Sequence, residues 1–264
     1  MKRLTFFIKG NVDVHDSLHS CRIGGELVWN GINDTLRTSH PGCTARVKHE
    51  TFTRSDALLQ ADGAIPEAFS SRSLPLAAYP LESQFSRAIF ETEADVIVLS
   101  IQSDITTGLL RHRKESFLFY ASEAQQWSVG DQQWLKSDFE PLGNLEVAES
   151  MANFASIIER IRNQSEAPIL IYNMSPITPG EKIHCYQGIG ESYSTRIRKF
   201  NVGLVDLSEK TGVSIIDIDS LLARKGADDL KLDTIHLTAP GYRLVAEEVV
   251  RVLADLGVLD EAKS

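Results

Sequence analysis

The chain has 264 residues, 42% of them hydrophobic and 24% charged, and is long enough to bury a sizeable core as one domain. Its formal net charge of -9 and pI near 5.3 argue against a nucleic-acid partner, because binding to phosphate backbones relies on clustered lysine and arginine. No apolar stretch approaches the length of a membrane span, and the first apolar run, residues 4–8, is too short for a signal sequence.

Short aliphatic runs alternate along the chain with segments of helical pattern. Strands are predicted at residues 4–8, 45–48, 94–101, 168–172 and 213–218. Helices are predicted at residues 82–93, 145–163, 192–211 and 241–256. This alternation predicts an α/β fold in which a parallel sheet of about five strands is covered by helices on both faces. We expect a single domain over residues 1–264. An insertion is predicted at 106–143, where the hydrophobic residues follow neither the helical nor the strand period.

Polar side chains and glycine follow several of the predicted strands directly. They are Gly10, Gln102–Asp104, Asn173–Ser175 and Asp219. Parallel α/β sheets place their sites at the carboxyl ends of the strands. We therefore expect the functional site at that edge of the sheet.

The most specific motif lies near the C-terminus, where Asp233 precedes His236 by three residues in Asp-Thr-Ile-His-Leu-Thr-Ala-Pro-Gly-Tyr. An aspartate at this spacing can orient one ring nitrogen of the histidine and leave the other as a general base. The motif resembles the last conserved block of the SGNH (GDSL-like) hydrolases. That resemblance implies a flavodoxin-like three-layer sandwich in which Asp233 and His236 serve a serine near the N-terminus.

Two registers are possible for the family's first block, Gly-Asp-Ser-Leu. The letters Asp16-Ser17-Leu18 match the last three, which makes Ser17 the nucleophile. Alignment on the end of the first strand instead places Val12, which has no nucleophilic atom, in the serine slot. The second register resembles a divergent branch of the superfamily associated with surface-polysaccharide genes, whose block reads roughly Gly-Ser-Cys-x-x-Arg-Asp.

We take Ser17 as the predicted nucleophile, at the start of a helix over residues 17–29. Backbone amides at a helix N-terminus would stabilise an oxyanion that forms beside the serine. The alternative is that Asp16 or Ser17 only caps this helix, which is a common role for both residue types.

The resemblance implies further site residues. Ser103, Gln102 and Gly63 are the candidates for the oxyanion hole, where the family uses a glycine and an asparagine. The residues expected to bind substrate are Asn11, Asp13, His15, Asp16 and Asp104. Because Ser103 stands in place of the asparagine, we expect a weaker oxyanion hole than that of the family.

Two other hypotheses compete with the triad. Asp13, His15 and His19 offer a carboxylate and two imidazoles with a spacing that could hold a divalent metal, which would indicate a metal-dependent hydrolase. Val12 in the strand-end slot favours a catalytically inactive binding protein.

The function we expect is hydrolysis of acyl esters, or acyl transfer, through Ser17, His236 and Asp233. Hydrolysis requires no cofactor, and the expected partner is a small-molecule or saccharide acyl ester. Three cysteines without a Cys-x-x-Cys spacing favour a cytoplasmic setting. The sequence leaves the substrate and the oligomeric state open.

Overall fold

A computed structural model describes residues 1–19, 21–180 and 191–260 of the chain. The chain forms two compact units. The first unit comprises Met1–His49, Glu93–Gln102 and Glu166–Ser264, and the second comprises Glu50–Thr92 and Ser103–Ser165.

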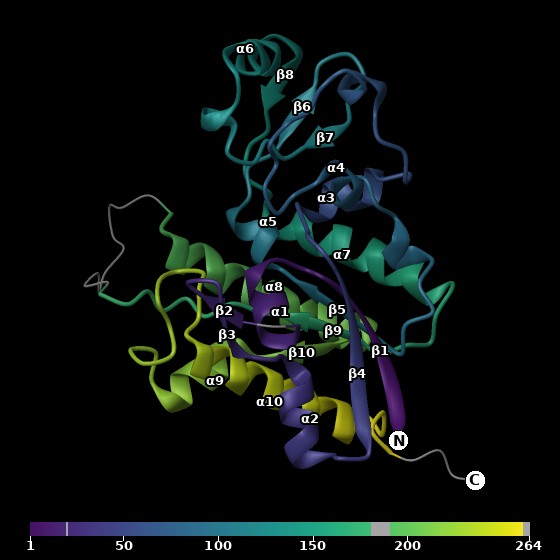
Figure 1. The fold of residues 1–264 in the computed structure, drawn as a ribbon, viewed down its shortest axis with the longest axis vertical. Helices are drawn as coiled ribbons and strands as arrows, with labels where there is room; N and C mark the ends of the chain where they lie inside the picture. The colour runs from purple at the N-terminus through teal and green to yellow at the C-terminus, as the bar shows by residue number, and fades with distance from the viewer. Residues whose placement is uncertain (20, 181–190, 261–264) are drawn as a thin grey trace. The chain divides into compact units, whose positions relative to one another are not determined.

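The first unit is built on a five-stranded sheet with the strand order β10-β9-β5-β1-β4 (Figure 1). Its strands are β1 (Lys2–Lys9), β4 (Cys43–Glu50), β5 (Val96–Ser100), β9 (Ile169–Tyr172) and β10 (Ser214–Ile216). The pairs β1–β5, β5–β9 and β9–β10 are parallel. The predicted parallel sheet is therefore confirmed, with a strand in each of the five predicted runs.

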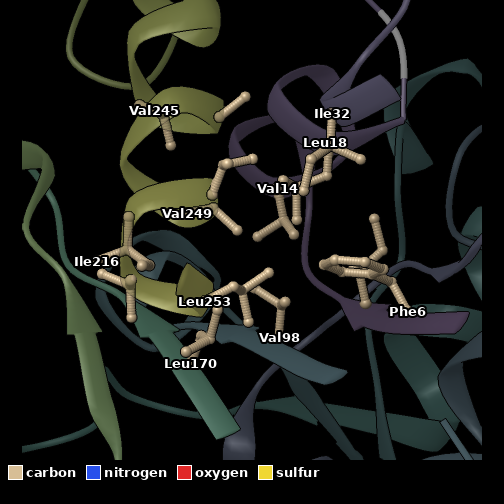
Figure 2. Close-up of a cluster of buried hydrophobic side chains, with 14 of the residues drawn as sticks. Phe6, Val14, Leu18, Ile32, Val98, Leu170, Ile216, Val245, Val249 and Leu253 are labelled. Atoms are coloured by element: carbon tan, nitrogen blue, oxygen red, sulfur yellow. The ribbon is translucent and has the colours of Figure 1, made fainter. Parts of the chain in front are cut away.

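One face of this sheet packs against α1 (Val12–Leu18), α2 (Ile32–Ser39) and α10 (Ala239–Asp255). Figure 2 shows side chains of the strands facing side chains of these helices. The labelled residues are Phe6, Val14, Leu18, Ile32, Val98, Leu170, Ile216, Val245, Val249 and Leu253. Burying each such side chain contributes about 1.5–3 kcal/mol relative to leaving it exposed.

Residues that alternate with this set point to the opposite face, because successive side chains of a strand point to opposite sides. Ile97 and Leu99 of β5 are among them, and both are fully buried. Helix α8 (Tyr193–Thr211) packs against β10, so the sheet is flanked by helices as predicted. Ser192 caps the start of α8, and Gly212 ends it with a φ of 69°.

The second unit combines short helices with a three-stranded antiparallel sheet in the order β7-β6-β8. The strands are β6 (Leu110–His112), β7 (Leu118–Phe119) and β8 (Phe139–Pro141). The helices are α3 (Ser55–Gln60), α4 (Leu81–Gln84), α6 (Val129–Asp138) and α7 (Val147–Arg162). Short 3₁₀ turns occur at Glu67–Phe69, Ala88–Phe90 and Ala124–Gln126. The predicted insertion at 106–143 contains this small sheet and α6.

The remaining elements are α5 (Gln102–Thr106), α9 (Ile218–Lys225), and a hairpin of β2 (Cys21–Ile23) and β3 (Glu26–Trp29). None of the helices in the described part of the chain has the length and apolar character needed to cross a bilayer.

Three of the four predicted helices correspond to α7, α8 and α10, but the helix predicted at 82–93 is wrong. Helix α4 ends at Gln84, and a separate 3₁₀ turn follows at Ala88–Phe90. Phe85 enters the aromatic core of the second unit, and Ser86 Oγ accepts a hydrogen bond from Ala88 N. Tertiary packing of Phe85 and this local cap outweigh helix propensity here.

Candidate active site

A small pocket lies in the first unit at the carboxyl edge of the sheet. It is lined by Asp13, Gln102, Asn173, Met174, Ser175, Ile218, Lys231, Thr234, Ile235 and Leu237. These residues follow β1, β5, β9 and β10 or belong to the turn before α10. The pocket volume is about 20 Å³, which is enough for one water molecule. The pocket therefore lies at the carboxyl edge, where the sequence predicts the functional site.

Asp233 and His236 lie on the turn that contributes Thr234, Ile235 and Leu237 to this pocket. His236 Nδ1 lies 2.8 Å from Asp233 Oδ2. The imidazole is 49% exposed and the carboxylate 56%. Because Nδ1 is engaged by the carboxylate, Nε2 is the nitrogen that can act as a base. The structure thus brings this predicted pair together.

The Asp233 carboxylate also organises the turn itself. Its Oδ1 accepts hydrogen bonds from the backbone N–H groups of Ile235, at 2.8 Å, and His236, at 2.7 Å. Burial would raise the pKa of Asp233, but the backbone amides of His236 and Ile235 and the imidazole outweigh it and lower the pKa. Asp233 therefore stays ionised while it orients His236.

Ser17 lies in the core of the first unit. It is fully buried near the end of α1, and its Oγ donates to Asp13 O at 2.7 Å. The same Oγ lies 3.1 Å from the hydroxyl of Tyr172, whose pKa is raised by burial. The hydroxyl of Ser17 is therefore directed into the core and is enclosed in this structure.

The helix predicted over residues 17–29 is wrong. Helix α1 begins at Val12, directly after β1, and the β2–β3 hairpin follows it. Gly24 and Gly25 form the hairpin turn with φ values of 59° and 87°. Ser17 therefore lies at the C-terminal end of a helix, where no orphan amides are available for an oxyanion.

The turn after β1 carries the other candidates of the first block. A Cβ on Gly10 would lie 2.4 Å from Val14 Cγ2, so only glycine allows α1 to start this close to the strand. Val12 is half-buried and packs on the apolar core. Asp13 lines the pocket and accepts hydrogen bonds from Ser100 Oγ and, at 3.2 Å, from Asn11 N.

Burial raises the pKa of Asp13 and outweighs these hydrogen bonds, which lower it. Ser100 Oγ also accepts a hydrogen bond from Gln102 N at 3.0 Å. The chain of contacts from Asp13 through Ser100 to Gln102 ties the turn after β1 to the turn after β5. Asp13, predicted to bind substrate, thus lies at the pocket.

The histidines near α1 form a stack. The ring of His15 lies 5.0 Å from that of His19 and 4.8 Å from that of His49, and His15 Nδ1 lies 2.7 Å from Asp16 Oδ1. Burial lowers the pKa of His49 to about 4. Among the described residues, no group of three His, Cys, Asp or Glu side chains is arranged to hold a metal ion. The geometry does not support the metal hypothesis for Asp13, His15 and His19.

The predicted oxyanion residues are assigned to different units. Gln102 lines the pocket. Ser103 and Gly63 belong to the second unit, where Ser103 Oγ donates to Phe52 O at 2.8 Å and Gly63 N donates to Phe85 O at 3.1 Å. These two donors are therefore used within their own unit.

Asp104 was predicted to bind substrate, but the structure gives it buried partners in the second unit. Its carboxylate accepts hydrogen bonds from Ser55 N at 2.7 Å, from Ser55 Oγ, and from Ser150 Oγ at 2.6 Å. Burial raises the pKa of Asp104 to about 6 and outweighs the hydrogen bonds from Ser150 and Ser55, which lower it. Asp104 therefore links α3 to α7.

Sequence reasoning missed Lys231, which lines the pocket and is 5% exposed. Its position two residues before Asp233 was the only sequence signal, and lysines before a turn are usually solvated. Asn173 also lines the pocket; the sequence placed it directly after a predicted strand but assigned it no role.

Comparison with known proteins supports the fold. No protein-family model matches the chain, and no curated protein matches it in sequence. Among solved structures, a protein from Slackia heliotrinireducens assigned to the SGNH hydrolases is similar, with a TM-score of 0.50 and 13% identity over 96% of this chain and 100% of that one.

Two further structures have the same fold. One is a member of the lipolytic protein G-D-S-L family from Veillonella parvula, with a TM-score of 0.50 and 11% identity over 95% of this chain and 98% of that one. The other is a catalytic mutant of the acetylxylan esterase Axe2 from Geobacillus stearothermophilus, with a TM-score of 0.53 and 10% identity over 95% and 94%. The resemblance to SGNH hydrolases is thus confirmed at the level of the fold.

Proposed function

We propose that this protein hydrolyses acyl esters, with His236 as the general base and Asp233 as the residue that orients it. The observation that carries the proposal is the 2.8 Å contact between His236 Nδ1 and Asp233 Oδ2, on a turn that lines a pocket at the carboxyl edge of the sheet. A base oriented in this way removes a proton from the attacking group and returns it to the leaving alcohol. The SGNH-like fold supports the same reaction class.

The attacking group has two candidates. Ser17 is the nucleophile expected from the sequence, but its enclosed hydroxyl requires α1 to move before it can reach an ester. In that route, the Ser17 oxygen bonds to the acyl carbon, the alcohol leaves with the proton from His236, and water then releases the acid. Direct attack by a water molecule that His236 activates requires no movement of α1.

The pocket supports a short acyl group. Its volume of about 20 Å³ admits only a small group, and its walls combine apolar Ile218, Ile235 and Leu237 with polar Asn173. An acetyl ester is therefore the preferred substrate in this proposal. Because a structure of similar fold is an acetylxylan esterase, acetylated saccharides are a natural class to test.

A catalytically inactive binding protein is the second candidate function. Two observations favour it: Val12, without a nucleophilic atom, begins α1 just after β1, and Ser17 is fully buried. A protein of this kind would bind an acylated saccharide without turning it over.

One experiment separates the two functions. Purified protein is incubated with p-nitrophenyl acetate and with acetylated xylo-oligosaccharides, and the released nitrophenolate and acetate are measured. Turnover that His236→Ala abolishes supports the hydrolase. Saccharide binding by calorimetry without acetate release, equal in the wild type and in His236→Ala, supports the binding protein. Acyl transfer is tested in the same assay by adding a saccharide acceptor and weighing the products by mass spectrometry.

A further inference from the structure

Lys231 is a buried lysine whose ammonium group is held by backbone carbonyls. The residue is 5% exposed, and its Nζ donates to Ser175 O at 2.9 Å and to Ile177 O at 2.5 Å. Burial lowers the pKa of Lys231 to about 8, although Asp233 and Asp219 partly counteract the shift. The ammonium group is therefore fixed in direction by two specific acceptors.

These acceptors belong to the segment that follows β9, whereas Lys231 begins the turn that carries Asp233 and His236. The two sides of this turn are paired, because Lys231 and Leu237 form an antiparallel bridge. Leu232 N donates to His236 O at 2.9 Å across the same turn. Lys231 thus connects the turn of the catalytic pair to the end of β9.

Burying the ammonium group of Lys231 is energetically unfavourable. Removing an ammonium group from water is unfavourable unless hydrogen bonds compensate for it. A methionine would fill nearly the same space without this penalty. What the ammonium adds is a fixed direction, because it binds the carbonyls of Ser175 and Ile177 and no apolar side chain can do so. The Thr178 and Thr234 hydroxyls, 3.3 Å apart, are a second and weaker link between the same two segments.

We propose that Lys231 is a positioning residue that holds the Asp233–His236 turn on the segment after β9, and so fixes the position of the imidazole relative to the end of that strand. Lys231 acts through His236 and does not itself react. The kinetic part of this inference rests on the proposed esterase function, but the structural part does not.

The first test measures amide hydrogen exchange in Lys231→Met, which keeps the apolar stem and loses the donors. The Leu232 amide, which bonds to His236 O, is expected to exchange about tenfold or more faster, while amides of β5 keep their wild-type rates. Lys210→Met, at the exposed end of α8, is the matched control. It should change neither the exchange rate of the Leu232 amide nor the rates of the β5 amides. Unchanged exchange at Leu232 in a folded Lys231→Met would overturn the proposal.

The second test is kinetic. Lys231→Met is expected to lower kcat for p-nitrophenyl acetate about tenfold or more with KM within about twofold, because a misplaced base affects the reaction more than binding. In Lys231→Ala, added n-propylammonium should restore part of kcat, whereas n-propanol of the same size should not. Equal rescue by both compounds would assign Lys231 a packing role only.

If Lys231→Met does not fold, Lys231→Gln retains two N–H donors, and its Leu232 amide should then exchange nearly as slowly as in the wild type. Rapid exchange at Leu232 in a folded Lys231→Gln would count against the carbonyl contacts. If the wild type shows no esterase activity, the proposed function fails, and the exchange experiment still decides the role of Lys231.

Discussion

The hydroxyl of Ser17 lies 3.1 Å from the hydroxyl of Tyr172, and both side chains are fully buried between α1 and β9. The residue that the sequence marks as a nucleophile therefore makes a contact between a helix and a strand. Whether Ser17 can attack an ester therefore depends on whether α1 moves away from β9.

Ser17 can be tested by labelling. A serine-directed fluorophosphonate, followed by mass spectrometry, should modify Ser17 if α1 opens during turnover, and the modification should disappear in His236→Ala. If water is the attacking group, Ser17 stays unlabelled, and Ser17→Ala keeps activity. In either case, we expect Ser17→Ala to lower the free energy of unfolding by about 1 kcal/mol, because Tyr172 loses a buried partner.

His236→Ala should lower ester turnover by roughly a hundredfold or more, the low end of a general-base contribution. The fold should remain intact because the side chain is 49% exposed. Steady-state hydrolysis of p-nitrophenyl acetate and circular dichroism check the two statements. His40→Ala, at the end of α2, is the control. Near-normal turnover in His236→Ala would exclude this histidine as the base.

Asp233→Asn should lower kcat on the order of a hundredfold or more with little change in Tm. The amide oxygen can still accept from the N–H groups of Ile235 and His236, but the amide permits the wrong imidazole tautomer. Asp233→Ala should lose both the tautomer control and the turn, and so should also lower Tm. An equal loss of Tm in the two variants would mark Asp233 as a structural cap.

Acyl chain length should control the rate. Because the pocket volume is about 20 Å³, kcat/KM is expected to fall about tenfold or more from p-nitrophenyl acetate to the butyrate. A matched series of acetate, propionate, butyrate and octanoate esters measures this dependence. Faster cleavage of octanoate would show that the acyl group binds elsewhere.

Asp104 should make stability depend on pH. Its pKa in the folded state is raised from 3.8 to about 6, so the protonated form is favoured by folding. The corresponding stabilisation is fully present below about pH 4 and is lost as the pH rises through about 6. A shift of this size corresponds to roughly 3 kcal/mol.

Urea unfolding from about pH 4 to pH 7 measures this effect, and the slope should be smaller in Asp104→Asn than in the wild type. The asparagine carries no charge to bury, and its amide oxygen can still accept from Ser55 N. Identical slopes in the two proteins would show that Asp104 does not titrate in this range.

Much of the fold could be predicted because its signals are local. The central strands of the sheet are short aliphatic runs, and the buried residues of β5 follow one another without interruption. The β2–β3 hairpin was missed although Gly24-Gly25 before Glu26–Trp29 is a hairpin signal. Missing it extended the predicted helix to Trp29 and placed Ser17 at the wrong end of a helix.

The pairing of Asp233 with His236 was determined by the sequence itself. Asp233 and His236 are three residues apart, so a single local turn brings their side chains together without long-range contacts. The carboxyl edge as the place of the site was also predictable, because parallel strands end at a common edge.

The environment of Ser17 and Lys231 was decided only by tertiary structure. Ser17 meets Tyr172 and Lys231 meets Ser175 across separations of 155 and 56 residues, and no local pattern encodes such contacts. Whether a hydroxyl or an ammonium group is solvated or enclosed depends on which helix and which strand end are packed over it. For that physical reason, the sequence determined the contact between Asp233 and His236, while the packing of α1 and of the segment after β9 decided what surrounds Ser17 and Lys231.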